Sequence, residues 1–260
     1  MQERYPNLNI TGPATIDFEY PFLLSALKLW PESVPLSALS HHLYVDRRGA
    51  PENPQNGFSS VEKFALAKAI AEQNPVCSGS VVVSEVNWPI AGTAVHSPVT
   101  APFEYANSSS LQLHDSGVSE QEYADFMLRY YVLGLCSGFV ERVYWWRLVA
   151  RGYGLVDIED NGSLRERPAF QALRHFLLTL GRATFERAAL PEQTANNHGE
   201  YRFEFSTPTG ERIIMCWSHG PAIPFPSDIN FESIEDISGK TLSQLPVELQ
   251  GSPVYCRRVK

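Results

Sequence analysis

The feature that most constrains the fold is an alternation of short apolar runs with longer helical patterns, repeated four times. The runs that predict strands lie at residues 8–17, 35–45, 79–86 and 139–149. The segments that follow them and predict helices lie at residues 21–30, 59–73, 118–138 and 167–181. Continuous apolar strands that alternate with helices are typical of a parallel sheet covered by helices. The sequence therefore predicts an α/β fold.

The ends of two of these helices are marked in the sequence. Ser59 or Ser60 is a suitable N-cap for the second helix. The third helix begins after Ser119, and Glu122 follows three residues later, which is the pattern of a capping box. Gly138 provides a C-cap for the same helix. These signals support the helical assignment independently of the apolar periodicity.

The pattern changes in the last third of the chain. Residues 199–218 alternate with a period of two around a Thr-Gly turn, which predicts a hairpin. Periodicity is lost before it, at residues 186–198. We therefore expect two domains, an α/β domain at 1–185 and a small antiparallel, β-sandwich-like domain at 186–260. The segment at 89–118 is too long for a plain connection, and such loops are usually functional.

Composition and charge exclude several classes of function. The formal net charge of −8 argues against a nucleic-acid partner, which would require a basic face. No apolar run approaches the roughly 20 residues of a membrane span. The cysteines include no CxxC pair, which argues against zinc ribbons, and a bridge between Cys216 and Cys256 stays open. We expect no metal and no cofactor. The first residues lack the apolar region of a signal peptide, and the localisation is left open, with a bacterial periplasmic or secreted location among the alternatives.

Polar and aromatic residues gather where each predicted strand ends. The carboxyl edge of a parallel sheet is where ligands bind in α/β proteins. Each residue also has a structural alternative, such as a buried histidine, a core tryptophan or a solvated strand end. The residues concerned are Asp17, Glu19, His42, Tyr44, Glu85, Asn87, Tyr144, Trp146 and Arg147.

The segments "ITGPA", "SHHLY", "VVVSEVNWP" and "VYWWRL" resemble the last four strands of retaining glycoside hydrolases of clan A. The similarity is to the β-xylosidase and α-iduronidase type and to bacterial exopolysaccharide hydrolases. This resemblance implies a partial (β/α)8 TIM barrel, made of the last four βα units, followed by a small antiparallel β-domain. It also implies a carbohydrate substrate.

The resemblance assigns roles to individual residues. Glu85 corresponds to the nucleophile, and Tyr44 is expected to donate its hydroxyl to the Glu85 carboxylate and to orient it. Retaining hydrolysis requires such a carboxylate together with a second carboxyl group that acts as acid and base. The side chains implied to contact the sugar are His42, Asn87, Trp88 and Trp146.

The chain departs from the family in its acid/base residue. That residue is a glutamate after an asparagine on the fourth barrel strand, and this chain contains no Asn-Glu dipeptide. Asp17 and Glu19 are candidate substitutes. We expect either a truncated product or a half-barrel that associates through its open edge.

Two functions therefore remain. The first is a retaining O-glycoside hydrolase, or its nucleophile-bearing portion, which is inactive as this fragment on unactivated substrates. The second is a non-catalytic carbohydrate-binding or assembly protein derived from a glycosidase barrel.

Overall fold

The structure is a computed structural model that describes residues 8–16, 19–44, 49–54, 57–93, 117–191 and 197–258. These residues form two compact units. The first unit comprises the described residues of Met1–Asp46, Pro54–Asn87 and Leu133–Trp146. The second comprises those of Arg47–Asn53, Trp88–Val132 and Arg147–Lys260.

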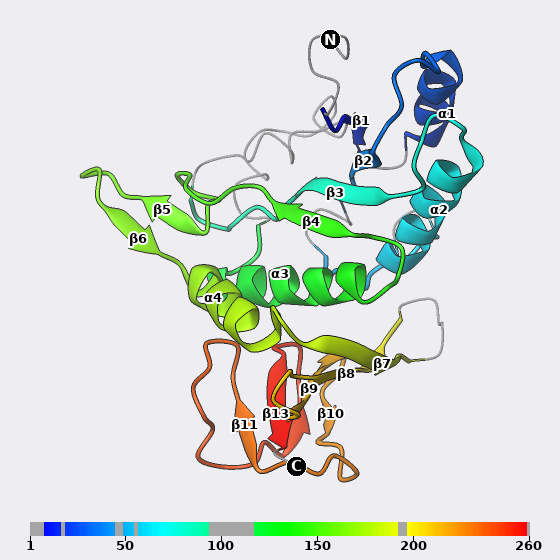
Figure 1. Cartoon of the computed structure of the whole chain (residues 1–260). Coiled ribbons are helices and arrows are strands. Elements are labelled where there is room, and N and C mark those ends of the chain that lie inside the picture. Colours follow the sequence, from blue (N-terminus) through cyan, green and yellow to red (C-terminus); the bar gives the residue numbers. More distant parts are fainter. Residues whose placement is uncertain are drawn as a thin grey trace. The chain divides into compact units, whose positions relative to one another are not determined.

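The first unit contains a four-stranded sheet with the order β1-β2-β3-β4 (Figure 1). Its strands are β1 (Thr11–Ile16), β2 (Ala38–His42), β3 (Val81–Val86) and β4 (Arg142–Trp145). Each pair of neighbouring strands is parallel. The predicted α/β class and the four parallel strands are therefore confirmed.

Two helices connect successive strands of this unit, α1 (Tyr20–Leu29) between β1 and β2 and α2 (Ser60–Gln73) between β2 and β3. Helix α2 begins with a capping box, in which Ser59 accepts the Glu62 N–H and Glu62 accepts the Ser59 N–H at 2.7 Å. Of the two candidate N-cap residues, Ser59 and Ser60, Ser59 is therefore the one that caps the helix. The core of the unit is apolar and fully buried, and it includes Leu23, Leu39, Phe64, Ala67, Val81 and Val83.

Helix α3 (Glu120–Leu135) begins with the predicted capping box. The Ser119 hydroxyl accepts the Glu122 N–H at 3.1 Å, and the Glu122 carboxylate accepts the Ser119 N–H at 2.8 Å. Beyond the end of the helix, Gly138 has a φ of 76°, which a residue with a Cβ rarely adopts. The capping box therefore marks the start of this helix, whereas Gly138 lies three residues beyond its end at Leu135 and is not its C-cap.

Both outer strands of the parallel sheet have an edge without a ladder partner among the residues that the structure describes. There, β1 pairs with β2 alone and β4 pairs with β3 alone. Large apolar side chains near these strands are exposed, namely Ile16, Phe22, Leu24, Leu29 and Tyr144. An exposed edge of this kind is a surface on which further strands can pair.

The second unit contains a hairpin that the sequence pattern did not predict. It consists of β5 (Val156–Ile158) and β6 (Leu164–Glu166), which pair antiparallel, and helix α4 (Pro168–Leu180) follows. Gly162 at its turn has a φ of 82°. Each strand has only three residues, so neither contains enough alternation to be detected. The Asn-Gly pair at residues 161–162 is the signal that could have revealed it.

A five-stranded antiparallel sheet forms the C-terminal part of this unit, in the order β11-β13-β9-β8-β7 (Figure 1). Its strands are β7 (Thr184–Ala189), β8 (Gly199–Ser206), β9 (Arg212–His219), β11 (Ser233–Glu235) and β13 (Val254–Arg258). The short strands β10 (Ile223–Pro224) and β12 (Glu248–Leu249) pair separately. The predicted hairpin at 199–218 is present as β8 and β9. Strand β7 crosses the boundary that we placed at residue 186.

A buried ion pair joins three segments of the second unit that are distant in the sequence. Arg129 on α3 donates to Glu52 from Nε at 2.9 Å and again from Nη2. The indole N–H of Trp217 on β9 donates to the same carboxylate at 2.7 Å. Burial is the largest single influence and would raise the pKa of Glu52, but the charge and hydrogen bonds of Arg129, with the nearby His219, together outweigh it and lower the pKa. Glu52 is therefore a buried carboxylate with its counter-charge in place.

The four cysteines are free thiols, and Cys216 and Cys256 are both buried in the core of the C-terminal sheet. No helix in the described ranges is long and apolar enough to cross a membrane.

Candidate functional site

The candidate site lies at the carboxyl ends of β2 and β3 in the first unit. The hydroxyl of Tyr44, two residues beyond β2, donates to Oε1 of Glu85 at 2.6 Å. Tyr44 is 3% exposed, whereas the Glu85 side chain retains 15% of its surface. The expected hydrogen bond is thus present. It leaves Glu85 partly open to solvent.

The aim of Glu85 depends on an irregularity in β3. Between Val83 and Val86, β3 advances by three residues while its partner β4 advances by two. In a regular strand Ser84 and Glu85 would point to opposite faces. In β3, by contrast, both side chains contact β2 or the segment that follows it. Ser84 accepts the Ser40 hydroxyl at 2.7 Å, and Glu85 accepts the Tyr44 hydroxyl. A bulge re-aims side chains in this way, and bulges are frequent beside active sites.

Lys63 supports the backbone of Tyr44 from helix α2. Its ammonium group donates to the Tyr44 carbonyl at 2.8 Å, and the residue is 1% exposed. A buried ammonium requires such a partner. The sequence did not indicate this role, because a lysine in a helical pattern ordinarily predicts the solvent face.

His42 is the third side chain of the site. Its Nδ1 lies 3.9 Å from Oε2 of Glu85, and its ring meets the Tyr44 ring edge-on at 6.4 Å. Burial lowers the pKa of His42 from 6.5, and the Glu85 charge opposes part of that shift. The imidazole is therefore neutral at pH 7, with both a donor and an acceptor nitrogen.

Asn87 and Trp146 lie at the same edge of the sheet. The Asn87 side-chain amide donates to the Trp146 carbonyl, and the Trp146 N–H donates to the Val86 carbonyl at 3.0 Å. Asn87 is 3% exposed, whereas Trp146 is half-buried. Asn87 therefore fixes the chain that follows β4, and Trp146 keeps an accessible surface.

Trp88, which the resemblance assigned to sugar binding, lies in the second unit and is 1% exposed. Its indole N–H donates to the Gly49 carbonyl at 2.8 Å. Its ring centroid lies 5.8 Å from that of Phe126 and 5.9 Å from that of Tyr130. A buried ring has no free face for a sugar, so Trp88 is a core residue in this structure.

The candidate acids are only partly within the described ranges. Glu19 is exposed and occupies the N-cap position of α1. Asp17 lies outside the described residues, as does most of the predicted functional loop, at residues 94–116. Within the described ranges, no group of three or more His, Cys, Asp or Glu side chains is arranged to hold a metal ion.

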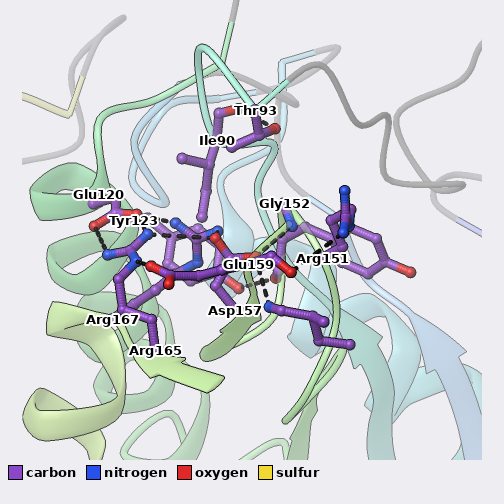
Figure 2. Close-up of polar contacts among 12 residues, drawn as sticks. Ile90, Thr93, Glu120, Tyr123, Arg151, Gly152, Asp157, Glu159, Arg165 and Arg167 are labelled. Atoms are coloured by element: carbon purple, nitrogen blue, oxygen red, sulfur yellow. Dashed lines mark hydrogen bonds and ion pairs between the residues drawn. The ribbon is translucent and has the colours of Figure 1, made fainter. Parts of the chain in front are cut away.

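A second feature, which the sequence analysis missed, is a cavity of about 790 Å³ in the second unit. Figure 2 shows its polar wall, where side chains from the start of α3 and from the β5–β6 hairpin meet. We call it the hairpin cavity. Its charged lining residues are Glu120, Arg151, Asp157, Glu159, Asp160, Arg165 and Arg167. The dense charge in "DIEDNGSLRER" was the available signal.

No protein-family model matches the chain, and no curated protein matches it. Solved structures that are similar to it include three glycosidases. A GH51 arabinofuranosidase from Xanthomonas axonopodis pv. citri has 10% identity and a TM-score of 0.48, over 95% of this chain and 55% of that chain. A GH39 enzyme from the same organism has 15% identity and a TM-score of 0.47, over 88% and 40%. An endo-β-1,6-glucanase has 13% identity and a TM-score of 0.39, over 85% and 41%. The chain thus spans 55% or less of the length of each of these structures.

Proposed function

We propose that the chain carries the nucleophile of a retaining O-glycoside hydrolase that acts on an oligosaccharide or polysaccharide. Glu85 is the nucleophile, and Tyr44 orients it. The observation that supports this proposal is the 2.6 Å hydrogen bond between these residues at the carboxyl edge of a parallel sheet. Ligands bind at this edge in α/β proteins.

The geometry suits nucleophilic attack for two physical reasons. The hydrogen bond from Tyr44 fixes the position of the Glu85 carboxylate, and a carboxylate is the group that attacks an anomeric carbon. The bond also holds Oε1, so that Oε2 is the oxygen left to react. Because Glu85 is part of a strand, the carboxylate is aimed by a rigid element.

The proposal assigns sugar contacts to two half-buried side chains. The neutral His42 ring can donate to one sugar hydroxyl or accept from another. Trp146 offers an aromatic surface to the C–H face of a pyranose. Asn87 is proposed to position Trp146 through its bond to the backbone of that residue.

The proposal includes a barrel architecture. The parallel sheet would be the last four strands of a (β/α)8 barrel within residues 1–185, and residues 186–260 would form the β-sandwich-like domain. The other four strands, in a longer chain or in a partner, would pair with the open edges of β1 and β4. They would also supply the acid/base carboxyl group.

The alternative is a non-catalytic carbohydrate-binding or assembly protein. Such a protein would keep the sugar contacts without the chemistry, because retaining hydrolysis of a natural glycoside needs a proton donor. Both functions predict sugar binding, and only the hydrolase predicts a covalent bond to Glu85.

The deciding experiment traps the nucleophile. The chain is incubated with 2-deoxy-2-fluoro glycosides of several sugars, each carrying 2,4-dinitrophenolate as leaving group. Attack by Glu85 forms an ester bond to the anomeric carbon and releases the phenolate, which needs no proton. Intact-mass and peptide analysis should find one fluoroglycosyl group on the peptide that contains Glu85.

The controls are Glu85→Gln, which should not be labelled, and Glu32→Gln, an exposed glutamate whose loss should change nothing. Labelling that persists in Glu85→Gln would overturn the assignment of the nucleophile. Sugar binding without any labelling would favour the alternative.

A further inference from the structure

The hairpin cavity has a fixed charged base. Glu120 accepts hydrogen bonds from Arg165 at 2.6 and 3.1 Å, and a further one from Arg167 (Figure 2). Asp157 forms ion pairs with the same two arginines. Its other oxygen accepts the Gly152 N–H at 2.9 Å. Because Arg167 is 1% exposed, this base is held rigidly.

The rim of the cavity is accessible. Arg151 is 52% exposed and donates to Asp160 at 2.7 Å, and Asp160 itself is 99% exposed. Glu159 is 42% exposed and lies 3.7 Å from Nε of Arg165. Exposed ion pairs of this kind are weak, so a ligand can exchange bonds with them at small cost.

The charges of the lining disfavour a strongly ionic ligand. Three arginines and four carboxylates line the cavity, so its formal net charge is −1. Each arginine already has a carboxylate partner. A phosphate or uronate would therefore meet a wall that is slightly negative, and a cation would lie beside the guanidinium groups.

The same lining suits a neutral polyol. Each sugar hydroxyl both donates and accepts a hydrogen bond. Carboxylate oxygens accept from such groups, and the planar guanidinium fork donates to two neighbouring oxygens at once. Ile90 lines the cavity as well, and Figure 2 places it across from the charged row, where it offers an apolar contact to C–H groups. The volume of about 790 Å³ is within the usual range of ligand sites, roughly 300–1,000 Å³.

We propose that the hairpin cavity is a saccharide-binding site of its own that selects uncharged glycans over uronates. The choice of a saccharide among polyols rests on the proposed function. The selection for neutral chains rests on the charges of the cavity. The rim residues Arg151 and Glu159 make the exchangeable contacts, and Glu120, Asp157 and Arg167 hold the base in shape.

The test uses the full 260-residue chain and two oligosaccharide mixtures of three to five sugar units. One mixture is neutral and contains xylo-, cello-, arabino- and β-1,3-gluco-oligosaccharides. The other contains oligogalacturonides and oligoglucuronides. Saturation-transfer NMR should give signals with the neutral mixture, and titration calorimetry then gives the Kd of the strongest binder. That Kd should change less than about twofold between 0.05 and 0.5 M NaCl, because no net charge is neutralised on binding.

Variants locate the binding. Arg151→Ala combined with Glu159→Ala should raise the Kd at least about tenfold. Arg212→Ala removes an arginine of similar exposure, 50%, from an ion pair with Glu204 outside the cavity, and it should leave the Kd unchanged.

Three outcomes would overturn the inference. They are preferential binding of the uronates, no binding of either mixture, and an unchanged Kd in the double variant. The trapping experiment is read separately. If binding depends on Arg151 and Glu159 but Glu85 is not labelled, the saccharide-binding cavity is supported and the hydrolase proposal is rejected. If Glu85 is labelled but no such binding is found, the hydrolase proposal is supported and the cavity inference is rejected.

Discussion

Tyr44 and Glu85 are 41 residues apart in the sequence, yet the Tyr44 hydroxyl and Oε1 of Glu85 lie 2.6 Å apart. Parallel pairing of β2 and β3 brings the two segments to one edge, and the bulge in β3 turns Glu85 toward the tyrosine. Lys63 then holds the Tyr44 carbonyl from the helix side. The pair is therefore specified by the sheet and by the helix together.

Tyr44→Phe should slow the labelling of Glu85 by the fluoro sugar about 10- to 100-fold. A hydrogen bond to a charged group contributes about 1.5–3 kcal/mol, and each 1.36 kcal/mol corresponds to a factor of ten. The measurement is the rate of mass increase at fixed reagent concentration. Tyr144→Phe, at a half-exposed tyrosine, is the matched control. Equal rates for Tyr44→Phe and the unmodified chain would show that the hydroxyl does not orient the nucleophile.

The chain alone should act on activated glycosides and fail on natural ones. General acid catalysis typically contributes about 10²- to 10⁴-fold, and an acidic phenol needs no such help. The measurement compares the first-turnover release of dinitrophenolate from a dinitrophenyl glycoside with cleavage of the corresponding oligosaccharide. Glu19→Gln tests the remaining candidate acid within the described residues. If the oligosaccharide is cleaved efficiently and Glu19→Gln abolishes that cleavage, Glu19 is the acid and the proposal of a missing one is wrong.

The stability of the first unit should fall as the pH drops below 6.5, and His41 should be one cause. His41 is fully buried, and burial, followed by the neighbouring His42, lowers its pKa to about 4. As the pH falls, His41 of the unfolded chain binds a proton near pH 6.5, whereas His41 of the folded chain binds one only near pH 4. Unfolding is therefore increasingly favoured between these two pH values. A shift of this size corresponds to about 3 kcal/mol.

Urea unfolding at pH 7.5 and pH 4 measures this effect. His41→Gln should reduce the pH dependence relative to the unmodified chain, because the glutamine does not titrate. Parallel pH curves for the two proteins would exclude His41 as the source.

Asp125→Asn should stabilise the second unit above pH 6 by up to about 2 kcal/mol. Burial raises the pKa of Asp125 to about 6, and the hydrogen bonds from Ser252 and Gln121 oppose that shift. The folded state therefore keeps a proton that the unfolded state loses near pH 3.8, and the stability falls as the pH rises from 3.8 through 6. The amide removes this cost and still accepts both hydrogen bonds. The gain should vanish at pH 3.5, and a gain that is independent of pH would contradict the explanation.

Arg129→Met should destabilise the chain by about 3–5 kcal/mol, because it leaves the buried Glu52 carboxylate without its counter-charge. The double variant Glu52→Gln with Arg129→Met should recover more than half of that loss. Arg212→Met breaks an exposed pair and should cost less than about 1 kcal/mol. Urea unfolding at pH 7 measures all three, and equal losses for the single and double variants would show that packing, and not charge, is responsible.

The sequence predicted the parallel strands, the starts of α2 and α3 and the β8–β9 hairpin because each depends on neighbouring residues. Continuous valines mark β3, and the serines at positions 59 and 60 mark the start of α2. The sequence also predicted the Tyr44–Glu85 contact, through the resemblance and the expected sheet. What it could not predict depends on contacts between distant segments.

Lys63, Glu52 and Trp88 illustrate this limit. A charged side chain predicts exposure unless its partner is known, and the partners here are a carbonyl 19 residues away and a guanidinium 77 residues away. Trp88 directly follows the residues of the candidate site in the sequence, but its ring packs on aromatic residues of α3. Adjacency in the sequence therefore did not indicate a shared role.

The Glu52 ion pair has a consequence for any attempt to transplant the C-terminal sheet as an autonomous module. Trp217 on β9 and Glu52 are 165 residues apart, and the carboxylate is completely enclosed. A chain cut at residue 186 would leave the indole N–H in the excised piece and the carboxylate with Arg129 in the remainder. Each piece would then expose to water a surface that is now dry. The sheet is thus not a detachable module, because a buried hydrogen bond of β9 depends on Glu52, which belongs to a distant segment of the chain.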